Sequence, residues 1–112
     1  MVELPDSWSV EEKISHLQRR ILVYSYQYYE IGDTVVDDSF YDSCVKQLLM
    51  LKDEYPEEYK RSFYYYAYKD FTGETGFYLY YRLRTKHAKI IKAIAYSSVD
   101  SYNRANDIKS VN

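Results

Sequence analysis

The stretch YSYQYYEIGDTVVDDSFYD, residues 24–42, decides the fold of this chain. Gly32 stands where a first helix would end in a left-handed cap, and Asp37 or Asp38 stands where a second helix would begin. One acid is enough to cap a helix, yet a third carboxylate, Asp42, and a tyrosine follow at once. The stretch therefore predicts a turn between two helices, and its surplus of acids needs a second explanation.

Helical signals continue on both sides of this turn. Ser9 and Glu12 form a capping box that starts a helix over 10–31, and Pro56 ends a second helix over 38–55. The apolar and aromatic positions of the first helix are Ile14, Leu17, Ile21, Tyr24, Tyr28 and Ile31, and those of the second are Tyr41, Val45, Leu48, Leu51 and Tyr55. These spacings predict an all-α protein in which residues 9–58 form an antiparallel helical hairpin.

The tyrosine-rich and basic extension, residues 59–105, has two interpretations. We expect helices over 57–71 and 77–97, because apolar residues keep a helical spacing through Ile94. The alternative is an α+β fold in which RSFYYYAYKDF and FYLYYRL form a tyrosine-rich β-hairpin across the turn TGETG. The last residues, 106–112, are polar and we expect them to be frayed.

Composition limits the protein class. A chain of 112 residues with 46% hydrophobic and 29% charged residues is expected to form one globular domain. Cys44 is the only cysteine, which excludes an internal disulfide and fits a reducing, cytoplasmic location. No signal peptide or apolar run of membrane-spanning length occurs, so we expect no membrane association. The chain is electrically polarised, with thirteen acids against six Lys and Arg up to Lys60 and four acids against nine Lys and Arg after it.

The hairpin resembles a known family. YSYQYYEIGDTVVDDSFYD, with its Asp-x-x-Tyr-Asp motif, and LLMLKDEYPE are similar to the small N-terminal domain of bacterial NAD-dependent DNA ligases. That domain binds the nicotinamide mononucleotide half of NAD. The resemblance covers residues 17–57 without a gap and implies a helical hairpin that holds a nicotinamide nucleotide.

The resemblance also implies roles for five residues. Tyr28 and Tyr41 would sandwich the nicotinamide ring, Asp38 and Asp42 would hold the ribose, and Tyr29 would stand where the family often has histidine or tyrosine. The chemistry of these side chains agrees, because a cationic ring favours aromatic faces and nearby carboxylates, while ribose hydroxyls need acceptors. The expected cofactor is NAD or nicotinamide mononucleotide, and no metal is expected.

The chain also departs from the family. The Lys-x-Asp-Gly motif of the adenylate-accepting lysine is absent, and Lys69-Asp70 is followed by Phe-Thr-Gly, which has the wrong spacing. Nothing in residues 59–112 resembles a nucleotidyltransferase domain. We therefore expect a non-catalytic accessory protein. A short chain with one borrowed enzyme module resembles, by analogy, the accessory proteins of phages and mobile elements.

Other functions remain open. The hairpin could be only a scaffold, with a tyrosine-rich surface that binds a host or phage protein, inhibits a host enzyme or self-associates. The residues predicted for that interface are Tyr64, Tyr65, Tyr66, Tyr68, Tyr78, Tyr80, Tyr81, Arg82 and Arg84. A weaker alternative is nucleic-acid binding through the basic stretch RLRTKHAKIIK. His16, His87 and Cys44 receive no role, since no partner for catalysis or metal binding accompanies them.

Overall fold

The computed structural model describes residues 2–74 and 76–111, and for 106–111 it describes the backbone alone. The first helix, α1 (Val10–Tyr26), begins at the predicted capping box. The Ser9 hydroxyl accepts from the Glu12 amide at 3.1 Å, and the Ser9 amide donates to the Glu12 carboxylate at 3.1 Å. The helix continues into a π-helical turn, η1 (Gln27–Ile31), and ends at Gly32, whose φ is 78°. The prediction of a helix over 10–31 is confirmed, with a widened last turn.

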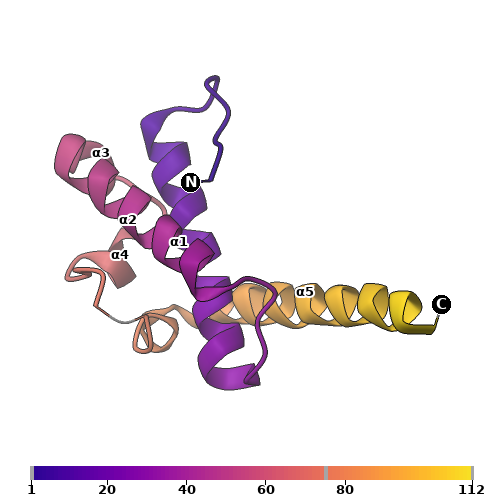
Figure 1. Cartoon of the computed structure of the whole chain (residues 1–112). Helices are drawn as coiled ribbons and strands as arrows, with labels where there is room; N and C mark the ends of the chain where they lie inside the picture. The colour runs from indigo at the N-terminus through magenta and orange to yellow at the C-terminus, as the bar shows by residue number, and fades with distance from the viewer. Residues whose placement is uncertain (1, 75, 112) are drawn as a thin grey trace.

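The second helix, α2 (Asp38–Glu54), begins at Asp37, which accepts from the Phe40 amide through its carboxylate at 2.8 Å. It ends at Tyr55, and Pro56 opens the short helix α3 (Pro56–Lys60). Proline suits this first helical position because the amide that it lacks would have no partner within the helix. α2 folds back along α1 (Figure 1), so the helical hairpin expected from the sequence is present.

The extension is helical only in part. It contains α4 (Tyr65–Tyr68), the 3₁₀ turn η2 (Tyr80–Arg82) and the long helix α5 (Thr85–Val111). The helix predicted over 57–71 is interrupted between α3 and α4, and the one predicted over 77–97 starts only at Thr85, since Leu83 is extended. No strand occurs among the described residues, so the alternative with a tyrosine-rich β-hairpin is wrong and the all-α fold is confirmed.

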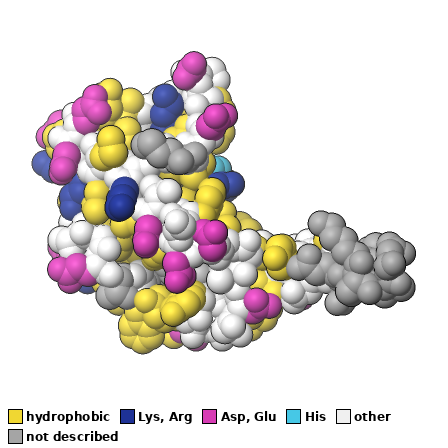
Figure 2. Space-filling view, in the orientation of Figure 1, with side chains coloured by type: hydrophobic (Ala, Val, Ile, Leu, Met, Phe, Trp, Pro, Cys, Tyr) yellow, Lys and Arg dark blue, Asp and Glu magenta, His cyan; other side chains and the backbone are white. Residues whose placement is uncertain are grey.

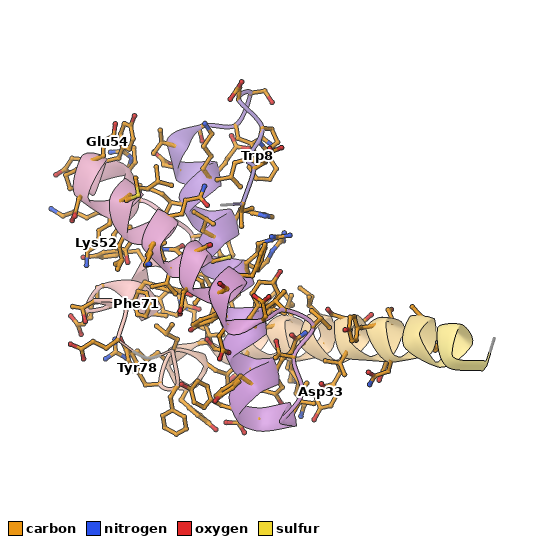
Figure 3. All side chains as sticks on the ribbon, viewed as in Figure 1. Trp8, Asp33, Lys52, Glu54, Phe71 and Tyr78 are labelled. Carbon is orange, nitrogen blue, oxygen red and sulfur yellow. The ribbon has the colours of Figure 1, made fainter. Side chains whose placement is uncertain are left out.

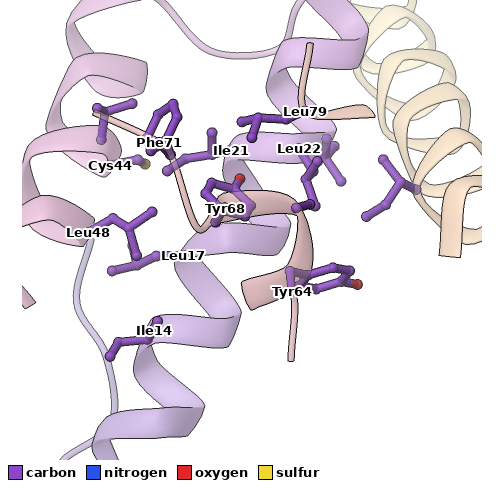
Figure 4. Packing of buried hydrophobic residues seen from close by; sticks show 14 of the residues in the cluster. Ile14, Leu17, Ile21, Leu22, Cys44, Leu48, Tyr64, Tyr68, Phe71 and Leu79 are labelled. Carbon is purple, nitrogen blue, oxygen red and sulfur yellow. The ribbon is translucent and has the colours of Figure 1, made fainter. Parts of the chain in front are cut away.

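The core lies where α1, α2 and the extension meet (Figure 4). Its fully buried side chains are Ile14, Leu17, Ile21 and Leu22 of α1, Cys44 and Leu48 of α2, and Tyr68, Phe71, Leu79 and Ile91 of the extension. Burial raises the pKa of the Cys44 thiol, which keeps it protonated and unreactive at neutral pH. The extension is therefore part of the same core as the hairpin.

Buried polar contacts fasten the extension to α1. The side-chain amide of Gln18 donates to the Ser62 hydroxyl at 2.9 Å, and its carbonyl oxygen accepts from the Tyr64 amide at 3.3 Å. The Tyr68 hydroxyl donates to the backbone carbonyl of Gln18 at 2.7 Å. On the other side, Lys52 of α2 donates to the Phe71 carbonyl at 2.9 Å, and the two residues lie side by side in Figure 3.

The long helix α5 projects from the body of the molecule (Figure 1), whose extents are 50 × 31 × 24 Å. Ile91, Ala95 and Val99 are buried, whereas the residues from Asp100 to Ala105 are exposed. The backbone is helical to Val111, but the side chains of 106–111 and all of Asn112 lie outside the described residues, so the expected fraying of 106–112 stays a prediction. Among the described helices, none is both long and apolar enough to cross a membrane.

Candidate functional site

The five residues predicted to bind a nicotinamide nucleotide surround one cavity of about 290 Å³ at the turn end of the hairpin. Tyr28 and Tyr29 come from η1, and Asp38, Tyr41 and Asp42 come from the first turns of α2. The sequence analysis missed the other described lining residues, which are Tyr24, Ser25, Thr34, Val36, Asp37, Gly73, Glu74 and Gly76. The structure thus brings the predicted residues together, and their role in binding stays a prediction.

The π turn shapes the aromatic wall of this cavity. The amides of Gly32 and Asp33 both donate to the Gln27 carbonyl, at 2.8 and 3.2 Å, which closes the wide turn. Tyr28 and Tyr29 stand on it with their rings 4.9 Å apart and 85° to each other. They remain 59% and 44% exposed, so both side chains reach the surface beside the cavity. Single π turns inside helices frequently occur at functional sites.

A pair of hydroxyls forms the inner wall. Ser25 of α1 and Tyr41 of α2 hydrogen-bond to each other at 2.9 Å, and both line the cavity. Burial raises the pKa of the half-buried Tyr41, while the Ser25 contact has a smaller, opposite effect. The phenol is therefore neutral at neutral pH and can donate one hydrogen bond and accept others.

Carboxylates surround the mouth. The charged side chains among the described lining residues are Asp37, Asp38, Asp42 and Glu74, and all four are exposed. Figure 2 shows acidic side chains next to hydrophobic surface at the lower end of the body, the end at which Asp33 is labelled in Figure 3. Aromatic faces beside negative charge provide good contacts for a cationic ring and for sugar hydroxyls.

The extension supplies the remaining wall through Gly73, Glu74 and Gly76. A Cβ atom on Gly76 would lie 2.3 Å from the Ser25 hydroxyl oxygen and 2.6 Å from the Tyr41 hydroxyl oxygen, so any larger residue would force the loop or these side chains to shift. Gly73 has a φ of 90°, and its Cβ would lie 2.6 Å from the Leu49 side chain. Two glycines in TGETG are the signal that could have indicated this close backbone approach.

The tyrosines predicted to form an interface do not share one exposed surface. Tyr64 and Tyr68 are buried, so these two side chains are not available on the surface. Tyr65, Tyr66, Tyr78 and Tyr80 are half-buried, and Tyr81, Arg82 and Arg84 are exposed. The guanidinium groups of Arg82 and Arg84 lie 4.4 and 4.6 Å from the ring centres of Tyr78 and Tyr66, so both arginines pack on this chain's own rings. Whether these residues contact a partner stays a prediction.

Other candidate groups lie apart from this cavity. An open hollow of about 660 Å³ is lined by Trp8, His16, Phe63 and His87 among others. Burial lowers the pKa of His16, with a further contribution from Arg20 and Arg19. Within the described residues, no group of three or more His, Cys, Asp or Glu side chains is arranged to hold a metal ion.

Comparison with known proteins agrees with this geometry. The family described as DNA ligase-like, N-terminal NAD+-binding domain matches residues 7–62, and this chain belongs to that family. The DNA ligase of Mycoplasmopsis pulmonis is 33% identical over 54 residues, and that of Thermosipho africanus is 37% identical over 54 residues. Each alignment covers 48% of this chain and 8% of the ligase. No solved structure shows a significant match to the chain. The resemblance predicted from 17–57 is confirmed, and the matched part of each ligase is its small N-terminal domain alone.

Proposed function

We propose that this chain is a non-catalytic module that binds the nicotinamide mononucleotide part of NAD in the cavity between η1 and α2. The observation that carries the proposal is the convergence of Tyr28, Tyr29, Asp38, Tyr41 and Asp42 on one cavity in a chain of an NAD+-binding family. The rings of η1 and Tyr41 would contact the nicotinamide. The carboxylates of α2 would accept hydrogen bonds from the ribose.

The module would act as an accessory to a separate nucleotidyltransferase or to a ligase. The family match ends at Ser62, before the segment that contains Lys69. Lys69 is exposed next to the short helix α4, and its neighbour Asp70 pairs with Arg82 at 3.6 Å. These surroundings do not resemble a nucleotide-binding lysine, which supports a binding rather than an adenylating role.

Calorimetric titration with nicotinamide mononucleotide tests this proposal. We expect a Kd between high micromolar and millimolar, about 4–6 kcal/mol, because an open cavity leaves part of the ligand in water. Asp42→Asn should weaken binding about tenfold, since it removes the charge from one acceptor. Asp53→Asn changes an exposed acid of the same helix outside the cavity and should bind like wild type. Absence of binding by the wild-type protein at millimolar ligand would refute the proposal.

Protein binding is the second candidate function. Tyr28, Tyr29, Phe77 and Tyr81 are between 44% and 62% exposed, and their rings contact one another in a row at 4.9, 5.4 and 6.0 Å. Glu30 accepts a hydrogen bond from the Tyr81 hydroxyl, which holds the end of the row in place. Exposed rigid aromatic groups are enriched at protein interfaces. Of the residues that the sequence predicted for an interface, this row contains Tyr81.

Sedimentation equilibrium tests self-association through this aromatic row. Tyr81→Ser should shift a self-association equilibrium toward the monomer. Tyr102→Ser, on the projecting part of α5, should leave it unchanged because Tyr102 lies outside the row. A wild-type protein that is monomeric at all concentrations would exclude a second copy of the chain as the partner.

A further inference from the structure

We propose that the cavity selects a cationic pyridinium nucleoside over its phosphorylated form, and that Glu74 adds to this selection. The inference rests on the proposed function, because it concerns the same cavity. It names nicotinamide riboside, rather than the mononucleotide, as the class of ligand that this chain binds best on its own.

The first step is the charge around the cavity. The cavity is lined by four acids from three segments of the chain. Asp37 lies in the turn, Asp38 and Asp42 lie at the start of α2, and Glu74 lies in the loop of the extension. A pyridinium ring carries one positive charge, which these carboxylates attract. A phosphate group adds a charge of about −1.5 to −2 at neutral pH, which they repel. Addition of the phosphate therefore weakens the net electrostatic attraction between the ligand and the cavity.

The second step concerns the N-terminus of α2, where the helix dipole places partial positive charge at this end of the hairpin. The N-terminus of α2 would attract a phosphate through its free amides. The Asp37 carboxylate already accepts a hydrogen bond from the Phe40 amide at 2.8 Å. Its negative charge offsets the positive end of the helix dipole. A phosphate at this helix end would have to replace that contact and approach two further acids, Asp38 and Asp42.

The third step is the origin of Glu74. It lies outside the family match of residues 7–62, on the loop that the extension lays against the hairpin. Gly73 and Gly76 on either side let this loop approach Leu49, Ser25 and Tyr41 so closely that a Cβ atom at either position would force a shift. The extension thus adds a carboxylate to a wall that the family's hairpin alone does not supply. Asp37, Asp38 and Asp42 lie within the family match, so the part of the selection that the extension adds is the contribution of Glu74.

Paired titrations test the inference. Wild-type protein is titrated with nicotinamide riboside and with nicotinamide mononucleotide at low salt, and we expect about tenfold tighter binding of the riboside from the opposite net charges of the two ligands. Raising the ionic strength to about 0.15 M reduces the Debye length to about 8 Å. This screening should bring the affinities for the riboside and the mononucleotide closer together. Glu74→Gln should reduce this ratio of the two affinities about twofold at low salt, since it removes one of four charges.

Glu3→Gln serves as the matched control, because Glu3 is an exposed acid near the N-terminus and outside the cavity. Circular dichroism of each variant checks that the helices are intact. Equal or tighter binding of the mononucleotide by the wild type overturns the inference and leaves the proposed function standing. An unchanged ratio in Glu74→Gln overturns the role of Glu74. If neither ligand binds, the proposed function fails, and this inference fails with it.

Discussion

Tyr41 connects the cavity to the interior of the hairpin. Its ring leaves the first turns of α2, and its hydroxyl meets that of Ser25 on α1 at 2.9 Å. The backbone of Gly76 lies so close to this pair that an added methyl group would force the loop or the two side chains to shift. Tyr41 therefore links α2 to α1 through its hydroxyl, and it lines the cavity next to the extension.

We predict that Gly76→Ala destabilises the protein by about 1–3 kcal/mol, the usual effect of an extra methyl group in a packed site. The added Cβ would lie 2.3 Å from the Ser25 hydroxyl oxygen, so the loop or Tyr41 must shift. Urea unfolding measures the change. The comparison is Gly32→Ala, where no atom lies within 4 Å but φ is 78°, so that its effect of about 1 kcal/mol would come from backbone strain alone. A stability equal to wild type in Gly76→Ala would show that the loop does not pack as described.

At the scale of elements, local signals account for the hairpin. Each helix end is fixed by contacts within a few residues, and each can be predicted from the sequence. The residues are Ser9 with Glu12, Gly32, Asp37 and Pro56. The approach of the five cavity residues followed from the same helix ends, since they place η1 opposite the first turns of α2.

The extension was harder to predict because distant contacts determine it. Tyr68 is buried, and its hydroxyl donates a hydrogen bond to the backbone carbonyl of Gln18. Tyr64 is also buried, and its backbone amide donates to the Gln18 side chain. Neither hydrogen bond produces a periodic pattern in the sequence around the tyrosines. The tyrosine-rich stretch was therefore compatible with both a helix and a strand. Glu74 and Gly76 were missed as cavity residues for the same reason, since only the packed extension brings them to the hairpin.

We predict that Gln18→Met destabilises the protein by about 2–3 kcal/mol, although the side-chain volumes are similar. The change leaves the buried Tyr64 amide without its acceptor and removes a hydrogen bond to Ser62. Gln47→Met is the matched control, because the Gln47 side chain also makes two hydrogen bonds. Both are to the backbone of Val2, at 3.1 and 3.0 Å, and the site is half-buried. Chemical unfolding should show a smaller loss there. Equal losses in the two variants would contradict a special role of the buried Gln18.

Across the whole molecule, buried tyrosines bind the helices together. Tyr59 donates through its hydroxyl to the Tyr68 carbonyl at 3.0 Å, and Tyr26 packs between Tyr80 of η2 and Tyr96 of α5 at ring distances of 4.6 and 6.1 Å. Burial raises the pKa of the buried phenols of Tyr26, Tyr59, Tyr64 and Tyr68. Their neutral form is therefore a condition for the folded state.

This arrangement predicts alkaline unfolding. Burial, with a smaller contribution from Tyr96, raises the pKa of Tyr26 to about 12 in the folded protein, against about 10 for an exposed phenol in the unfolded chain. A folded pKa above the unfolded one means that stability is complete below pH ~10 and is lost as the pH rises toward 12. Tyrosinate absorbance should therefore increase in the same step in which circular dichroism reports loss of helix.

The variant Tyr26→Phe tests the contribution of a single phenol to this transition. It keeps the ring that packs against Tyr80 and removes the ionisable hydroxyl, so its stability at pH 7 should stay within about 1 kcal/mol of wild type. Its loss of stability between pH ~10 and 12 should be smaller than that of wild type, because the unfolded chain gains one ionisation fewer. Urea unfolding at several pH values measures both quantities. An identical loss in the two proteins would show that Tyr26 ionises without unfolding, and that the packing of η2 and α5 against α1 does not depend on its neutral hydroxyl.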